Sequence, residues 1–114
     1  MWLPANAKRV AGKYGAVKTQ VDGITFSSKA EARRYGELQL LVRAGLIADL
    51  KLQPKFDLTV NGVKVCAYVA DFQSTRKGVL IIEDVKSPAT KTRVYAIKKK
   101  LMQAIHGLHI TETA

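Results

Sequence analysis

The chain has 114 residues, which suffice for one domain with a hydrophobic core but not for two. Apolar residues make up 47% of the sequence and charged residues 25%, which is typical of a folded globular protein and excludes a disordered one. Lysine and arginine number 19 against nine acidic residues, giving a formal net charge of +10. This excess points to a polyanionic partner, with nucleic acid first and an anionic membrane second.

The sequence carries no sign of membrane insertion or export. No apolar segment approaches the roughly 20 residues that a spanning helix needs, and residues 1–14 lack the apolar stretch of a signal peptide. The single cysteine, Cys66, forms no intrachain disulfide and is too few for a metal cage. We therefore expect a cytoplasmic protein with no membrane partner.

Residues 1–14 are predicted to form a basic N-terminal arm, and residues 15–114 a single domain. The arm carries Lys8, Arg9 and Lys13 and has little hydrophobic periodicity. Two interpretations stay open for it, a loosely docked terminus and a segment that contacts phosphates. Residues 16–26 follow as a short hairpin that turns at Asp22-Gly23.

Residues 28–44 are predicted to form a helix. Ser28 and Glu31 have the spacing of a capping box, and Gly45 is placed to end the helix. The apolar stripe of this helix consists of Tyr35, Leu38, Leu41 and Val42. Glu31 lies on the same stripe, so it is either a helix cap or part of a functional site.

Residues 47–60 read as an extended segment that is interrupted at Pro54, and Asn61-Gly62 is a strong two-residue hairpin signal. The next strand starts at Val63 and carries Val63, Val65, Ala67, Val69 and Asp71 on one face. A two-residue turn would pair Gln53 with Ala70, on the face opposite Asp71.

Residues 79–82 are apolar on both faces, which indicates a central strand covered on both sides. The strand ends in Glu83, Asp84, Val85 and Lys86, and a turn at Lys77-Gly78 precedes it. If that turn has two residues, Asp71 lies directly opposite Asp84, with Cβ atoms about 5 Å apart. Asp84 and Lys86 share a strand face and lie roughly 7 Å apart along it.

Two carboxylates held this close repel each other unless one is protonated or a cation lies between them. Carboxylate oxygens are the ligands that Mg²⁺ and Mn²⁺ prefer. Such an ion could polarise a phosphodiester and activate water, and Lys86 could stabilise the developing charge. Glu31 would be a further ligand if its helix packs over this face, and Glu83 would replace Asp84 if the register shifts by one residue.

Residues 87–92 read as a polar loop, and residues 93–106 as a second helix that ends at Gly107. A final strand is predicted at residues 108–111. The apolar stripe of the second helix continues into the strand and consists of Val94, Ile97, Leu101, Ala104, Ile105 and Leu108. His106, at the end of the helix, and His109 are expected to have no catalytic role.

The element order and the acids together resemble the PD-(D/E)XK nuclease superfamily. The resemblance covers roughly residues 27–110 and rests on Asp71, the run Asp84-Val85-Lys86 and the upstream Glu31. Within the superfamily the chain looks most like small phage-encoded proteins similar to Holliday-junction resolvases, an impression to which residues 28–32 and 52–54 add. Ala70 stands where the motif has proline, and Asp84 where glutamate is commoner.

The resemblance implies an α+β fold with a restriction-endonuclease-like core: helix, three-stranded antiparallel meander, helix and strand, in a mixed sheet flanked by helices. It implies a Mg²⁺-dependent endonuclease, with Mn²⁺ as a substitute, that uses Glu31, Asp71, Asp84 and Lys86 on branched or structured DNA. It favours a homodimer in a bacterial or phage-infected cytoplasm, without a small-molecule cofactor.

The expected partner is DNA, and the residues expected to contact it are Arg33, Arg34, Lys91, Arg93, Lys98, Lys99 and Lys100. The lysines at 98–100 could instead form a solvated helix face. Two other functions stay open. One is a non-catalytic DNA-binding or recombination accessory protein on an inactive nuclease fold. The other is a protein-binding modulator of a phage replication complex.

Overall fold

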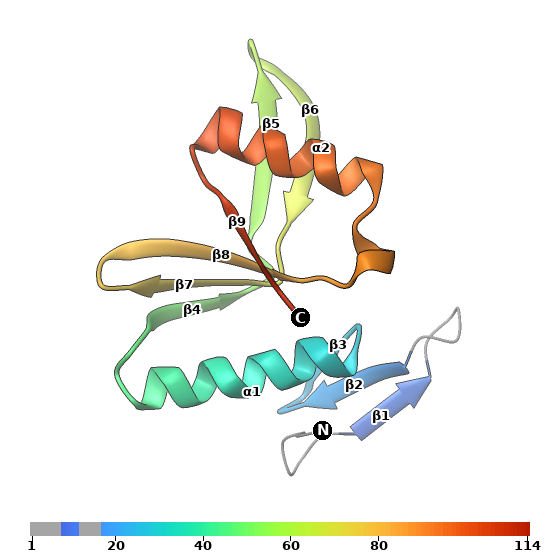
Figure 1. Cartoon of the computed structure of the whole chain (residues 1–114), viewed down its shortest axis with the longest axis vertical. Coiled ribbons are helices and arrows are strands. Elements are labelled where there is room, and N and C mark those ends of the chain that lie inside the picture. The colour runs from blue at the N-terminus through green and yellow to red at the C-terminus, as the bar shows by residue number, and fades with distance from the viewer. Residues whose placement is uncertain (1–7, 12–16) are drawn as a thin grey trace. The chain divides into compact units, whose positions relative to one another are not determined.

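The computed structural model describes residues 8–11 and 17–114 (Figure 1). The chain divides into two compact units, Met1–Leu46 and Ile47–Ala114, and each is described by itself. Compact units are not in themselves separate domains, so a single domain over residues 15–114 stays a prediction. Residues 1–7 and 12–16 of the predicted arm and hairpin lie outside the described residues.

The first unit contains an antiparallel sheet in the order β1-β2-β3, followed by one helix. Its elements are β1 Lys8–Ala11, β2 Val17–Val21, β3 Ile24–Phe26 and α1 Lys29–Arg43. The hairpin between β2 and β3 is confirmed, and Asp22 and Gly23 take the positive φ angles of 52° and 77° that such a tight turn needs. Part of the predicted arm, residues 8–11, is a strand that pairs with β2.

Helix α1 confirms the predicted ends. Ser28 is the N-cap, and its Oγ accepts a hydrogen bond from the backbone N of Glu31 at 3.1 Å. Gly45 has a φ of 73°, and the N–H groups of Gly45 and Leu46 donate to carbonyls of the last helical turn. Tyr35 and Leu38 are buried as the stripe predicted, but Val42 is exposed.

The second unit contains a mixed sheet in the order β4-β7-β8-β9, in which β8 and β9 run parallel, and a separate β5–β6 pair. The strands are β4 Ala48–Leu52, β5 Lys55–Val60, β6 Val63–Val69, β7 Phe72–Arg76, β8 Val79–Val85 and β9 Ile110–Thr113. Between β8 and β9 lie η1 Pro88–Thr90, α2 Arg93–Leu101 and the π-helical turn η2 Met102–His106. The predicted α+β class with a mixed sheet is confirmed.

One long bent hairpin replaces two strands of the predicted meander (Figure 1). The first arm breaks at Gln53 and Pro54, as predicted, and the second breaks at Ala70 and Asp71. Pro54 lacks a donor for the ladder and Gln53 has a φ of 51°, so the backbone turns here. The arms stay joined across the bend, because Gln53 N donates to Asp71 O at 3.0 Å and Ala70 N donates to Pro54 O at 3.1 Å.

The predicted pairing of Gln53 with Ala70 is wrong. The two-residue turn at Asn61-Gly62 forms, with φ angles of 49° and 79°, but the register shifts between Leu58 and Thr59. This β-bulge inserts one residue and moves the rest of the hairpin by one position. Gln53 therefore bonds to Asp71 instead.

The core of the second unit lies between the strands and α2–η2. Its buried members are Leu58, Tyr68, Ala70, Ile82, Tyr95, Met102 and Ile110, and Leu101, Ile105 and Leu108 pack against them. The predicted stripe is wrong at Val94 and Ile97, which are 61% and 58% exposed. Tyr95 and Met102 face inward instead, and the π-helical turn after Leu101 breaks the 3.6-residue period on which the prediction rested.

Among the residues that the structure describes, no helix is both long and apolar enough to cross a membrane. The final strand begins at Ile110, two residues later than predicted.

We expect Leu58→Ala to lower the free energy of unfolding by about 2–5 kcal/mol, because Leu58 is fully buried and truncation leaves a cavity. Val63→Ala on β6 is the matched control, since Val63 is 65% exposed and should cost less than about 1 kcal/mol. Urea denaturation followed by circular dichroism measures both. Equal losses would contradict the assignment of this core.

Candidate functional site

Asp71 and Asp84 lie opposite each other where β7 begins and β8 ends. The predicted register is confirmed, because Arg76 pairs with Val79 and Phe72 pairs with Glu83. One position further on, Asp71 N donates to Asp84 Oδ1 at 2.9 Å, and Val85 N donates to Asp71 Oδ2 at 2.8 Å. Each carboxylate thus bonds to the backbone of the other chain segment.

This exchange follows from the bend in the hairpin. Asp71 N also donates to Glu83 O at 3.1 Å, so the ladder between the two segments continues up to the point where β6 departs. Backbone donors inside a protein need partners, and beyond this point the carboxylates supply them. Both acids are therefore held in fixed positions by the same feature that bends the hairpin.

Burial weakens the charged form of both acids. Asp84 is only 2% exposed, and its desolvation raises the pKa to about 6, against the opposing effects of the Asp71 N–H and Lys86. Glu112 adds to this rise through charge repulsion. Desolvation likewise raises the pKa of Asp71, opposed by the Val85 N–H and by Lys86. The hydroxyl of Tyr68 also donates to Asp84 Oδ2. Added positive charge here would stabilise both carboxylates.

Lys86 follows β8 directly, and its backbone N donates to Thr113 O at 2.8 Å on β9. Its Nζ lies over the ring of Tyr95, 4.2 Å from the ring centroid. Since Lys86 lowers the pKa of both Asp71 and Asp84, its positive charge acts on the acid pair. Three of the four residues predicted to be catalytic therefore come together in the second unit.

The fourth, Glu31, belongs to the first unit. It is buried at the start of α1, where Ser27 Oγ donates to its Oε2 at 2.5 Å. Its part as a third metal ligand stays a prediction. Glu83 is the predicted replacement for Asp84 as a metal ligand if the register between β7 and β8 shifts by one residue. The register is not shifted, and Glu83 alternates with Asp84 along β8, so the two point to opposite faces of the sheet.

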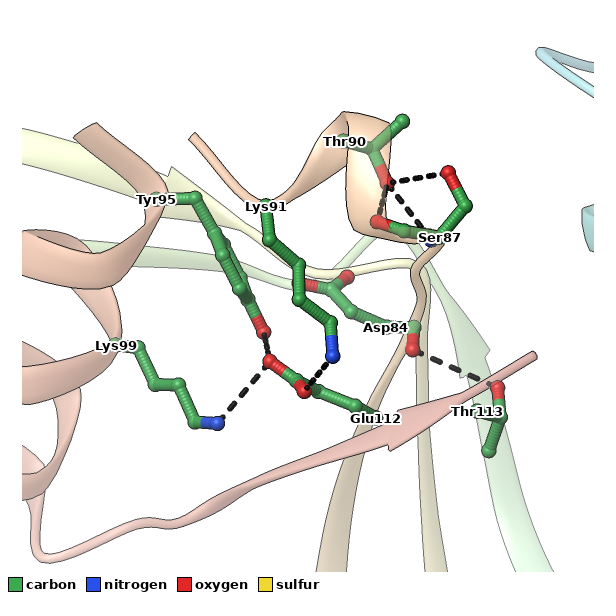
Figure 2. Close-up of polar contacts among 8 residues, drawn as sticks. All are labelled: Asp84, Ser87, Thr90, Lys91, Tyr95, Lys99, Glu112 and Thr113. Carbon is green, nitrogen blue, oxygen red and sulfur yellow. Dashed lines mark hydrogen bonds and ion pairs between the residues drawn. The ribbon is translucent and has the colours of Figure 1, made fainter. Parts of the chain in front are cut away.

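A second polar cluster, centred on Glu112 of β9, was not found from the sequence. Figure 2 shows Tyr95, Lys91 and Lys99 converging on this carboxylate. Tyr95 Oη donates to Glu112 Oε2 at 2.7 Å, Lys99 Nζ lies 3.0 Å from the same oxygen, and Lys91 Nζ lies 3.0 Å from Oε1. These donors lower the pKa of Glu112 to about 2, whereas burial and the contact with Glu112 raise the pKa of Tyr95.

The cluster lies beside the acid pair because β9 runs parallel to β8, with Glu112 in register with Asp84. Paired residues of neighbouring strands point to the same sheet face. A parallel pairing across a helical crossover leaves no local pattern in the sequence, so only the presence of an acid near residue 112 could have been noticed.

The residues predicted to contact DNA differ in their ion pairing and in their exposure to solvent. Lys91 and Lys99 pair with Glu112, and Arg34 pairs with Glu37 at 3.7 Å on α1. Arg33 and Lys98 are partly buried, and Arg93 and Lys100 are exposed. Contact with DNA stays a prediction for all seven residues.

Asp71 and Asp84 are compatible with a magnesium site. In the described part of the chain, no three or more histidine, cysteine, aspartate or glutamate side chains gather closely enough to hold a metal. Mg²⁺, however, is commonly bound through one or two carboxylates, with water and substrate phosphate completing its shell. Two desolvated carboxylates with raised pKa values offer that donor set.

We expect the stability of the metal-free protein to fall, relative to Asp84→Asn, as the pH rises from 4 to 8. The pKa of Asp84 is raised from 3.8 to about 6 in the folded state, so its stabilising contribution is complete below 3.8 and is lost as the pH passes 6. The shift corresponds to about 1–3 kcal/mol after allowance for solvent screening. Urea denaturation in EDTA at several pH values measures it. Asp57→Asn is the control, and because it keeps Asp84 it should lose stability with pH as the wild type does. The same pH trend in the wild type and in Asp84→Asn would contradict the prediction.

Comparison with known proteins identifies a family. A family model described as "Protein of unknown function (DUF1064)" matches residues 11–111. No curated protein and no solved structure matches the chain. Because the family model covers most of the 114 residues, the chain belongs to the DUF1064 family.

Proposed function

We propose that this protein is a metal-dependent DNA endonuclease of the PD-(D/E)XK type. The observation that carries the proposal is the meeting of Asp71 and Asp84, where Asp71 N donates to the Asp84 carboxylate and Val85 N donates to the Asp71 carboxylate. The charge of Lys86 acts on both acids. A buried acid and a partly buried acid beside a lysine, in a chain of net charge +10, suit a reaction on a polyanionic phosphodiester.

The order of elements supports a restriction-endonuclease-like core. Helix α1 precedes the bent hairpin and β8, then α2 leads back to β9, which lies parallel to β8. This succession of helix, antiparallel strands, helix and strand is the one that the sequence resemblance implies. The candidate acids lie at the end of β8 and at the start of its antiparallel neighbour β7.

Each residue has a role in this proposal. Asp71 and Asp84 would hold the Mg²⁺ or Mn²⁺ ion, which polarises the scissile phosphate and lowers the pKa of water when bound. Lys86 would bring a compact positive charge to the oxygen atoms on which negative charge develops. Glu31 is proposed as a further acid of the site.

The proposed substrate is DNA that is branched or otherwise structured, in phage recombination, replication or packaging. A nuclease of this kind reads backbone charge and shape, so a base-reading motif is not required. Exposed basic residues such as Arg93 and Lys100 would contribute to the binding of phosphates.

A non-catalytic DNA-binding or recombination accessory protein is the second candidate. It is favoured by the structural use of the acid pair, because both carboxylates accept backbone hydrogen bonds at the bend of the hairpin. Acids engaged in this way stabilise the fold without any metal. Such a protein would bind DNA with steep salt dependence and would cleave none.

We expect cleavage of a labelled four-way junction in Mg²⁺ or Mn²⁺, and a loss of at least about 10²-fold in Lys86→Ala and Asp84→Asn. A linear duplex, single-stranded DNA and EDTA are run alongside, with Asp57→Asn as the matched control. The substrate preference identifies the class of nuclease. Binding of every substrate without cleavage in either metal would instead establish the accessory protein.

We also expect Mg²⁺ or Mn²⁺ to raise the melting temperature in a concentration-dependent way, because an ion that binds only the folded state stabilises it by mass action. The increase should disappear in Asp71→Asn and Asp84→Asn and persist in Asp57→Asn. Thermal unfolding at constant ionic strength measures it. An increase that survives in both acid variants would place the metal elsewhere.

A further inference from the structure

We propose that Glu112 is a positioning residue, which holds the ammonium group of Lys86 beside the acid pair by anchoring the ring of Tyr95. The chain of contacts runs from β9 through α2 to the end of β8. A catalytic use of this lysine rests on the proposed function, whereas its positioning by Glu112 and Tyr95 does not.

Lys86 needs such a support. A lysine side chain has a flexible four-carbon stem and about 2 kcal/mol of rotamer entropy, so an unsupported ammonium group samples many positions. The structure places its Nζ 4.2 Å from the centroid of the Tyr95 ring, a distance at which a cation is attracted to the ring face. The position of this ring therefore determines where the lysine charge lies.

The ring of Tyr95 is held on several sides. Tyr95 lies on α2, is 7% exposed and belongs to the core of the second unit. Its ring centroid is 6.5 Å from that of Tyr68, whose hydroxyl donates to Asp84. At the far end of the ring, its own hydroxyl donates to Glu112 at 2.7 Å. The two tyrosines thus link the two acids of neighbouring strands.

Glu112 is itself fixed. Its carboxylate receives Lys99 from α2 and Lys91 from the preceding loop, each at 3.0 Å (Figure 2). Its backbone position is set by the parallel pairing of β9 with β8, in register with Asp84. Three side chains, Tyr95 and Lys99 of α2 and Lys91 of the loop before it, therefore converge on this carboxylate.

This arrangement gives Lys91 and Lys99 a task in addition to the predicted contact with DNA. Their ammonium groups already pair with Glu112, so they anchor the carboxylate that anchors Tyr95. A lysine engaged with a carboxylate is a weaker phosphate contact than a free one. Loss of Glu112 should therefore release two cations while it loosens a third, Lys86.

The test uses the full chain and has two readouts. The first is the chemical shift of the Lys86 Cε protons by nuclear magnetic resonance, which a ring lying below the side chain moves upfield. The second is the division of any change between kcat and KM in junction cleavage. Glu112→Ala, Glu112→Gln, Tyr95→Phe and Tyr95→Leu are compared, with Asp57→Asn as an acid that also pairs with a lysine, Lys64.

We expect Tyr95→Leu to abolish the upfield shift and Glu112→Ala to reduce it, with a fall in kcat of about 3- to 30-fold, the range for loss of a cation–π contact. KM should stay unchanged or fall, because Lys91 and Lys99 become free. Glu112→Gln keeps an acceptor for the Tyr95 hydroxyl and should restore most of the shift. Tyr95→Phe keeps the ring without its anchor and should lie between wild type and Tyr95→Leu.

An upfield shift that is unchanged in folded Glu112→Ala and Tyr95→Phe would overturn the proposal. Tyr95→Phe keeps the packing of the core, so a failure of Glu112→Ala to fold would leave a decisive variant. If the wild type cleaves no DNA, the proposed function fails, and the chemical shifts still decide whether Glu112 and Tyr95 position Lys86. A rise in KM without a change in kcat or in the chemical shift would also contradict the positioning role.

Discussion

The second unit depends on two hydrogen bonds at the ends of β7 and β8, one from Asp71 N to the Asp84 carboxylate and one from Val85 N to the Asp71 carboxylate. Each carboxylate satisfies a backbone donor of the other segment at the point where the long hairpin bends. The bend separates the β5–β6 pair from the mixed sheet, and α2 and η2 pack against the core that forms between them. Asp71 N has a second acceptor in Glu83 O, whereas the bond from Val85 N is made to the Asp71 carboxylate, and leaving such a backbone donor unpaired is costly.

The same bonds create an electrostatic conflict. Two acids are desolvated side by side, and the backbone N–H groups and Lys86 only partly offset the resulting rise in their pKa values. A proton relieves the conflict at low pH, and a divalent cation would relieve it at neutral pH. The two carboxylates accept backbone hydrogen bonds that the fold uses, yet their raised pKa values show that their negative charge is only partly balanced. For this reason the acid pair is the strongest functional candidate in the second unit.

A second acid on the adjacent strand has the opposite character. Glu112 has ample partners, its pKa is lowered to about 2, and it receives a tyrosine and two lysines. The two acids differ because Asp84 is buried and has no lysine in direct contact among the described residues, whereas Glu112 lies on the edge strand β9, where it pairs with a lysine of α2 and one of the preceding loop. Tyr95 links them, since its hydroxyl meets Glu112 and its ring meets Lys86.

The sequence by itself determined the features that depend on neighbours along the chain. Turn dipeptides located the hairpins, capping residues set the ends of α1, and the two-residue turn at Lys77-Gly78 placed Asp71 opposite Asp84. Only the tertiary structure decided the bulge that brings Gln53 to Asp71, the inward face of α2 and the position of Glu112 beside Asp84. The physical reason is that bulges, π-helical turns and parallel pairings are set by packing between distant segments, which leaves no period in the sequence.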